Sequence, residues 1–305
     1  MDKNIDSRLS KRMLAVAEMV RSCKDYEEKE VSDHISVGDT AGGDHHGFRV
    51  ADIGCDHAFV SIYLIQHGIA DMVIAADVNP GPLETAKSNI MRYGISMSEN
   101  SMNNPDNDLS GVNIADSDTG IINIRLSNGF EKIKKGETDA AVIAGMGGRL
   151  IISIIDGADV FVPGYRLILS PQSDVPEVRL YLLEHGFRLM DEDMIEEEGK
   201  YYNIIWAEFV GAPQLEEKTG EAAALNDKNT AQPEESEEKQ ILIRYGENLI
   251  KKKDPVFKEY LEKRRTSLGT IYKNLAEPCS PLVVTRREEI KAELDEIDIV
   301  LGKLV

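Results

Sequence analysis

The stretch VADIGCDHAF, residues 50–59, contains a strand, a turn and the start of a helix, and is the most informative part of this chain about its fold. A short apolar strand ends at Gly54, and a helical pattern over residues 58–66 follows at once. Gly54 can adopt a positive φ, and the first amides of the helix can face an anionic group. An ordinary strand-to-helix turn is the alternative, because only one glycine of a glycine-rich loop is present. The stretch predicts a βα unit with a possible ligand site at the carboxyl end of the strand.

Similar units follow along the chain. Two further runs, 187–195 and 201–210, have only the turn-like Glu198-Gly199-Lys200 between them and should form an antiparallel hairpin at one edge. Parallel strands followed by such a hairpin are typical of class I methyltransferases, whereas a Rossmann dehydrogenase usually ends on a parallel strand. The predicted fold is therefore an α/β, Rossmann-like class I methyltransferase sheet. Strands are expected at residues 48–54, 72–78, 121–126, 139–145 and 165–169, and helices at 7–22, 58–66, 80–93, 149–155 and 175–185.

Composition narrows the class of protein. The chain has 305 residues, 42% of them hydrophobic, and a formal net charge of -19. No apolar run approaches the roughly 18 residues of a bilayer span, and the N-terminus lacks the apolar core of a signal peptide. Three widely spaced cysteines indicate a reducing cytoplasm. His45-His46 lacks further ligand spacing, so no metal site is expected.

The negative charge is concentrated in three polar segments. Residues 24–47 carry seven acidic and two basic side chains, 95–120 carry five and none, and 211–240 carry eight and three, which gives -5 for each. Residues 241–275 carry nine basic and four acidic side chains, net +5. The overall charge therefore does not exclude a nucleic-acid partner.

The C-terminal part has a different periodicity. Ile290, Leu294, Ile297, Leu301 and Leu304 step by four and three residues, which is a heptad pattern. A weaker version precedes Pro278 and Pro281, so two antiparallel helices are expected to pair as a short coiled coil. The predicted organisation is a methyltransferase domain over 1–210 with acidic insertions at 24–47 and 95–120, an acidic linker at 211–240, and a helical coiled-coil domain at 241–305.

Polar or glycine residues follow each predicted strand. Asp77 comes 25 residues after Asp52, where an acidic side chain can accept hydrogen bonds from ribose hydroxyls, although it could also cap the next helix. Asn128 could face an adenine edge or belong to a plain Asn-Gly turn. The run 145–148 leaves bare backbone that a ligand can approach. Pro171-Gln172 suits a flat nucleobase or forms an ordinary loop.

These motifs carry a resemblance to a known family. The order LSKRM, ADIGCDHAF, GPLETAK, IAGMGG, LILSPQ and EEEGKYYNIIWAEF resembles the TrmK family of bacterial tRNA adenine-N1 methyltransferases. The resemblance covers residues 7–210 apart from the insertions at 24–47 and 95–120, and the coiled-coil tail is also similar. The resemblance implies S-adenosylmethionine as the methyl donor and the adenine at position 22 of tRNA as the acceptor.

Matched to the family's motifs, the strand ends acquire roles. Asp56 and Gln172 are the candidate catalytic residues, although Asp56 could instead contact the cofactor or cap the helix. Gly145 and Met146 are placed beside the cofactor, and with Gly147 they would border the target pocket. The cofactor residues are predicted to be Asp52, Gly54, Asp56, Asp77, Asn128, Gly129, Gly145 and Met146, and the target-pocket residues Gly147, Gly148 and Pro171.

Basic side chains outside the pocket are predicted to hold tRNA phosphates, with a solvated helix face as the alternative. Non-catalytic tRNA binding, a methyltransferase with another acceptor, and a Rossmann oxidoreductase are the other functions considered. We expect a monomer rather than a dimer. The RNA-binding candidates are Lys11, Arg12, Lys251, Lys252, Lys253, Arg264 and Arg265.

Overall fold

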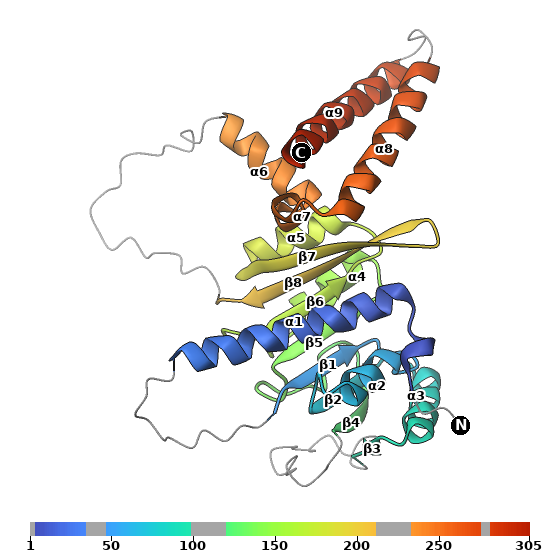
Figure 1. Ribbon diagram of the computed structural model, residues 1–305, viewed down its shortest axis with the longest axis vertical. Coiled ribbons are helices and arrows are strands. Elements are labelled where there is room, and N and C mark those ends of the chain that lie inside the picture. Colours follow the sequence, from blue (N-terminus) through green and yellow to red (C-terminus); the bar gives the residue numbers. More distant parts are fainter. Residues whose placement is uncertain (1–3, 35–46, 99–119, 212–232, 276–280) are drawn as a thin grey trace, which may run out of the picture. The chain divides into compact units, whose positions relative to one another are not determined.

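The computed structural model describes residues 4–34, 47–98, 120–211, 233–275 and 281–305 (Figure 1). These residues fall into two compact units. The first comprises Met1–Asp191 and Tyr202–Ala212, and the second Glu192–Tyr201 and Pro213–Val305. Within the described ranges, no helix is long and apolar enough to cross a membrane.

One eight-stranded sheet has the order β3-β4-β2-β1-β5-β6-β8-β7. The strands from β3 to β6 in this order pair in parallel, and β8 pairs with β6 in the antiparallel direction. Glu198 and Gly199 both have positive φ and connect β7 to β8, as a tight hairpin turn requires. The predicted parallel strands and edge hairpin are confirmed. The strands are β1 (Arg49–Ile53), β2 (Met72–Asp77), β3 (Ser96–Met97), β4 (Ile121–Leu126), β5 (Ala140–Ala144), β6 (Arg166–Ser170), β7 (Phe187–Glu197) and β8 (Lys200–Phe209).

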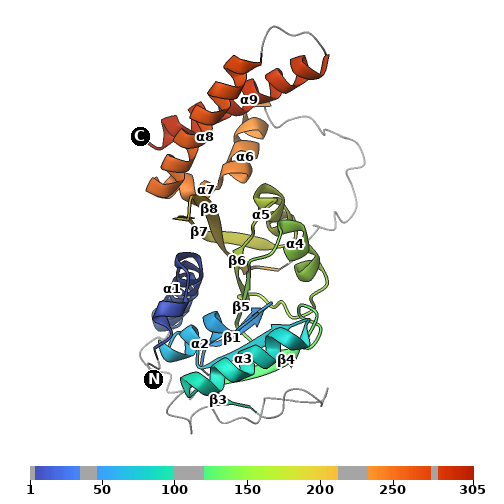
Figure 2. The ribbon, with the colours of Figure 1, turned by 90° about the vertical axis from the view of Figure 1, so that its right-hand side faces the viewer.

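Helices cover both faces of the sheet in the first unit. Val50 of β1 packs into the core under α1, α2 and α3, whereas the next residue, Ala51, packs under α4 and α5. This alternation follows from the two-residue period of a strand, and because both faces are covered, the parallel strands are largely apolar. Figure 2 shows α1 and α4 on opposite sides of the strands. The helical elements are η1 (Asp6–Arg8), α1 (Lys11–His34), α2 (Phe59–Gln66), α3 (Pro80–Tyr93), α4 (Gly148–Asp156) and α5 (Val175–Glu184).

The second unit is helical around its own core. The core includes Met194 of the hairpin tip together with Phe257, Leu261 and Ile297 from the helices. Asp254 caps α8 by accepting a 2.7 Å hydrogen bond from the Phe257 amide. The helices are α6 (Pro233–Tyr245), α7 (Glu247–Lys252), α8 (Pro255–Asn274) and α9 (Pro281–Lys303).

Several boundaries differ from the sequence-based prediction. The first helix continues to His34, into the segment expected to be a loop, and β3 lies at the start of the second acidic segment. Two helices were expected in the tail, but α6 and α7 precede them. Gly246 (φ 92°) separates this added pair, and Lys253 (φ 52°) ends α7. Charge-rich composition concealed these helices, because their apolar positions are few.

Candidate active site

The parallel strands β4, β2, β1, β5 and β6 end at the same edge of the sheet, and the predicted site residues follow them there (Figure 1). Backbone hydrogen bonds join neighbouring turns. The Gly54 amide donates to the Ala76 carbonyl at 2.8 Å, and the Gly145 amide donates to the Ser170 carbonyl at 3.2 Å. The chain order reverses between β1 and β5, and open α/β sheets bind ligands in the crevice at such a point. The structure therefore brings the predicted strand-end residues to one edge.

The turn after β1 has an unusual backbone. Gly54, Asp56 and Ala58 all have left-handed φ, at 73°, 49° and 57°. A Cβ added to Gly54 would lie 2.1 Å from the terminal methyl carbon of Met146, so that side chain would have to move, and the φ of 73° itself favours glycine. The left-handed conformation costs a non-glycine residue about 1–2 kcal/mol, and such strain is concentrated at functional sites.

The Asp77 carboxylate connects the ends of β1 and β2. It accepts a hydrogen bond from the Asp56 amide at 3.3 Å and another from the Asn79 amide at 2.8 Å. Although Asp77 is only 8% exposed, each carboxylate oxygen retains acceptor capacity beyond its backbone donor. This carboxylate beside the glycine turn suits a ligand that carries ribose hydroxyls.

Asp52 lies below this edge and is buried. The Ser61 hydroxyl of α2 donates a 2.5 Å hydrogen bond to its carboxylate. Burial raises the pKa of Asp52 to about 6, and the nearby negative charge of Asp77 adds to this shift. The structure therefore places Asp52 where it supports the turn from within, and its predicted contact with the cofactor stays a prediction.

Replacing Asp52 by asparagine should stabilise the ligand-free protein at about pH 8 and much less at about pH 4. The raised pKa means that the protonated carboxyl favours the folded state below pH 3.8, and that this advantage is lost as pH rises through about 6. Asparagine can still accept the Ser61 hydrogen bond without a buried charge. The gain at pH 8 should be on the order of 1–3 kcal/mol, measured by urea denaturation. Equal gains at both pH values would contradict this explanation.

Asp56 points its carboxylate outward, with 62% of the side chain exposed and the His57 Nε2 atom 3.7 Å away. Cys55 is buried, and desolvation together with the neighbouring carboxylates raises the pKa of its thiol. Cys55 is therefore held as a neutral thiol and is no nucleophile. In the part of the chain that the structure describes, no group of three metal-ligating side chains occurs. His45 and His46 lie outside the described residues.

In the turn after β4, a side-chain hydrogen bond joins two residues of the turn. The exposed Asn128 amide donates a 2.8 Å hydrogen bond to the Glu131 carboxylate. Gly129 has φ 55°, and a Cβ there would lie 3.0 Å from the Ile154 side chain. In this structure the Asn128 side chain thus stabilises its own turn, and contact with a cofactor would require it to leave Glu131.

The glycines after β5 divide into two environments. Gly145 is exposed with φ 80°, and the Met146 backbone carbonyl accepts a 2.9 Å hydrogen bond from the Gln172 backbone N–H. Gly148 is buried, and a Cβ there would lie 2.4 Å from the Ser173 carbonyl oxygen. Gly148 therefore allows α4 to pack closely, and this packing alone accounts for a glycine at that position. Its assignment to the target pocket stays a prediction. Gln172 is exposed, but Pro171 is buried, and a Cβ on Gly147 would lie 3.2 Å from the Ser173 hydroxyl oxygen.

Comparison with known proteins identifies the family of this chain. A general methyltransferase-domain model matches residues 44–118, which include the β1 and β2 ends. The family model described as TrmK, tRNA (adenine(22)-N(1))-methyltransferase, matches residues 110–301. The chain belongs to the TrmK family. The fold class predicted from the strand order, a Rossmann-like class I methyltransferase sheet with a C-terminal helical region, is confirmed with it.

Relatives in the TrmK family include the tRNA (adenine(22)-N(1))-methyltransferase of Bacillus subtilis, 34% identical over 53% of this chain and 59% of that protein. A putative tRNA methyltransferase of Mycoplasma genitalium is 26% identical over 54% of this chain and 63% of that protein. The alignments thus span less than two thirds of these two curated relatives.

Among solved structures, the B. subtilis TrmK crystal structure aligns over 96% of this chain and 98% of its own, at 25% identity and a TM-score of 0.62. A Streptococcus pneumoniae putative tRNA (m1A22) methyltransferase, solved in complex with S-adenosyl-L-methionine, has the same identity and a TM-score of 0.61, and covers 96% of this chain and 99% of its own.

Against this TrmK background, the predicted RNA-binding side chains of the tail all have partners. Arg264 pairs with Glu293 and Arg265 with Asp298, each at 2.7 Å. Exposed ion pairs of this kind are worth little, so phosphates could compete for the same guanidinium groups. The other pairs are Lys251 with Glu247, Lys252 with Asp193, and Lys253 with the Val305 carbonyl.

The structure separates the two RNA-binding candidates at the start of α1. Lys11 is exposed, whereas Arg12 is half-buried with its guanidinium over the Tyr202 ring. Sequence reasoning missed Tyr202 and also Ser61. Ser61 belongs to a uniformly apolar helix, so its spacing did not reveal the bond to Asp52. For Tyr202, the only signal was an aromatic pair at the start of the final strand.

Proposed function

We propose that this chain transfers a methyl group from S-adenosylmethionine to N1 of the adenine at position 22 of tRNA. The observation that carries the proposal is the TrmK family match over residues 110–301, supported by the B. subtilis relative of that description. Gly54 and Asp77 at the strand edge fit an adenosine-containing ligand.

S-adenosylmethionine, when bound, supplies a methyl group on a positively charged sulfur. Asp77 would accept hydrogen bonds from the ribose hydroxyls, and the bare backbone at Gly54 would allow close approach. Gly145, with its exposed backbone, and Met146, which lies against Gly54, would border the same ligand. Asp52 would hold the turn through Ser61.

The acceptor chemistry asks mainly for positioning. Adenine N1 carries a lone pair, so no residue has to remove a proton before N1 attacks the methyl carbon. Because methylation leaves a positive charge on the base, a nearby carboxylate stabilises the transition state. The outward-pointing Asp56 carboxylate is suited to this role, and it can also take a proton from N6. The exposed Gln172 amide would face the edge of the adenine.

Radiolabelled S-adenosylmethionine and unmodified tRNA transcripts test the proposed reaction. Label should enter a transcript with adenine at position 22 and should not enter one with guanine there. Primer extension should stop at position 22, because a methyl group on N1 blocks the pairing edge. Equal labelling of both transcripts would indicate another acceptor. Tight tRNA binding without any labelling would indicate a non-catalytic binding protein.

For the tail we propose that α8 and α9 form an antiparallel coiled coil. The two helices pack together and bury Leu261, Leu268, Ile290 and Ile297 between them. Cross-helix ion pairs flank this seam, as coiled coils commonly show. We keep residues 241–305 as the proposed tRNA-contact domain and residues 1–210 as the methyltransferase domain. Of the predicted linker at 211–240, residues 233–240 belong to α6.

The proposed cellular setting is a reducing cytoplasm, with the protein acting as a monomer. Cys23 and Cys55, the cysteines among the described residues, are both buried and form no disulfide. This supports a compartment in which thiols stay reduced.

A further inference from the structure

Arg12 and Tyr202 are in contact near the carboxyl end of β5, which Gly145 follows. The Arg12 guanidinium carbon is over the Tyr202 ring, 5.0 Å from its centroid. The Arg12 Nη2 atom would be 3.9 Å from a Cβ placed on Gly145. One pair thus connects α1, β8 and the end of β5, three segments that are far apart in the sequence.

The sheet register explains how Tyr202 reaches this place. In the antiparallel pair of β6 and β8, Leu169 lies opposite Ile205. Because the two strands are antiparallel, the residues before Ile205 on β8 lie toward the carboxyl end of β6, which Pro171 and Gln172 follow. Tyr202, three residues before Ile205, therefore lies toward that end.

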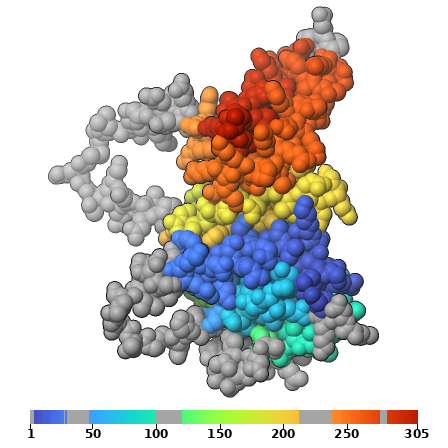
Figure 3. Space-filling view, viewed as in Figure 1, coloured from blue at the N-terminus to red at the C-terminus, as the bar shows by residue number. Residues whose placement is uncertain are grey.

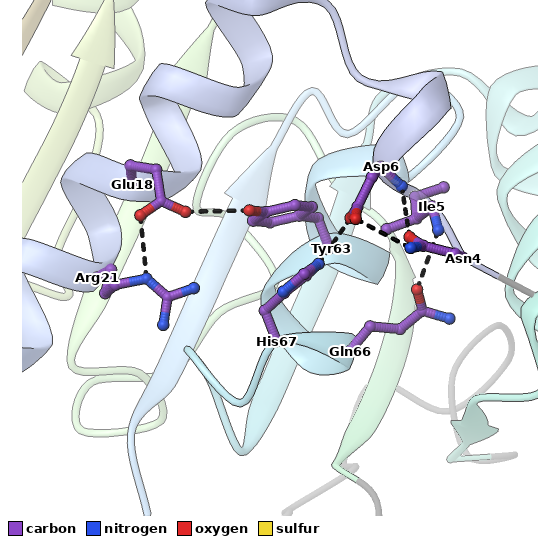
Figure 4. A network of polar contacts seen from close by, with 8 residues as sticks. All are labelled: Asn4, Ile5, Asp6, Glu18, Arg21, Tyr63, Gln66 and His67. Carbon is purple, nitrogen blue, oxygen red and sulfur yellow. Dashed lines mark hydrogen bonds and ion pairs between the residues drawn. The ribbon is translucent and has the colours of Figure 1, made fainter.

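Helix α1 brings Arg12 there by packing across β5 and β6, and Figure 3 shows it running over this face of the first unit. Polar contacts join α1 and the segment before it to α2 and to His67, which caps the end of α2 (Figure 4). One contact is made before Arg12 in the sequence and one after it. Asp6 contacts His67 Nε2 at 2.7 Å, and Glu18 accepts a 3.0 Å hydrogen bond from the Tyr63 hydroxyl.

The same α2 begins directly after the turn that contains Gly54. One helix therefore supports both the proposed cofactor turn and the position of Arg12.

Charge decides what Arg12 can bind there. The proposed reaction converts a neutral adenine into a cation, so a guanidinium stacked on the base would oppose the charge that develops. The phosphates on either side of that nucleotide are negative, and the forked N–H donors of a guanidinium match the geometry of phosphate oxygens.

We propose that Arg12, held by Tyr202, positions the acceptor nucleotide by binding a phosphate next to it. This inference rests on the proposed tRNA methylation. It differs from a general grip on tRNA, because the contact is made to the nucleotide that reacts. Arg12 and Tyr202 are then positioning residues, and their loss should lower the rate of methyl transfer even when all the enzyme has tRNA bound.

The test is single-turnover methylation at saturating tRNA and S-adenosylmethionine. Arg12→Ala should lower the rate about 10- to 100-fold, as expected when a reacting group is misplaced. Tyr202→Leu should give a similar loss, whereas Tyr202→Phe keeps the ring and should keep most of the rate. The slope of log affinity for tRNA against log salt should fall by about one for Arg12→Ala. Affinity for S-adenosylmethionine should not change.

Arg92→Ala is the matched control, since it removes one positive charge from an exposed position on α3 of the same unit. Its rate should equal that of the wild type. A loss in Arg12→Ala that disappears at saturating tRNA, or an equal loss in Arg92→Ala, would overturn the inference. Thermal melting identifies variants that fail to fold. A folded Tyr202→Phe variant that loses as much rate as Arg12→Ala would contradict the proposed role of the ring. If the wild-type protein methylates no tRNA, both the proposed function and this inference are overturned. If the wild-type protein is active and Arg12→Ala is equally active, only the inference about Arg12 is overturned.

Discussion

Replacing Asp77 by alanine is expected to abolish measurable binding of S-adenosylmethionine. The carboxylate is the acidic group proposed for the ribose hydroxyls, and hydrogen bonds to a charged group are each worth about 1.5–3 kcal/mol. Loss of two such bonds lowers affinity by roughly 10²-fold or more. Isothermal titration calorimetry with S-adenosylmethionine measures the change.

Asp71 provides a control at the opposite end of the same strand. Its carboxylate also accepts a backbone hydrogen bond, from the Phe48 amide at 2.7 Å. Asp71→Ala should therefore cost some stability and leave cofactor affinity unchanged. If Asp77→Ala bound S-adenosylmethionine as tightly as Asp71→Ala does, Asp77 would have only a structural role in joining the β1 and β2 turns.

Asp56→Asn is expected to lower the rate of methyl transfer about 10²- to 10³-fold while cofactor affinity stays close to that of the wild type. Asparagine tolerates the left-handed φ of 49° at this position, so the variant removes the charge without the backbone strain that alanine would add. Single-turnover kinetics and a binding titration on the same sample separate the two effects.

The matched comparison is Asp56→Ala, which keeps neither the charge nor the conformational preference. A rate close to the wild-type value in Asp56→Asn would exclude a role for the carboxylate in stabilising the charged base. A large fall in cofactor affinity in both variants would instead assign Asp56 to the cofactor.

The sequence predicted five of the parallel strands because each is a short, largely apolar run followed by glycine or a polar residue, whereas the two-residue strand β3 has no such pattern. The Asp77 position followed from the same logic, since the ends of adjacent parallel strands must lie together. Side-chain partners could not be predicted in this way. Neither the bond from Ser61 to Asp52 nor the stacking of Arg12 on Tyr202 has a local signature, because each depends on how distant elements cross.

Charge in the tail shows the same limit. The clusters near Arg264 predicted an open basic face, but the acidic residues of α9 lie beside them only after the helices pair. A net charge calculated for residues 241–275 does not include the acidic residues of α9, which follow later in the sequence. The predicted phosphate contacts in this region therefore depend on competition with existing ion pairs.

The hairpin that divides between the two units has a consequence for how this protein could change over evolution. Residues 192–201 belong to the helical unit, where Met194 enters the core, although residues 187–191 and 202–209 of the same two strands belong to the first unit. A recombination event that exchanged only the residues after the sheet would leave Met194 without its partners. The helical unit is thus not an independently transferable module, and changes in its core are expected to be inherited together with changes at the hairpin tip.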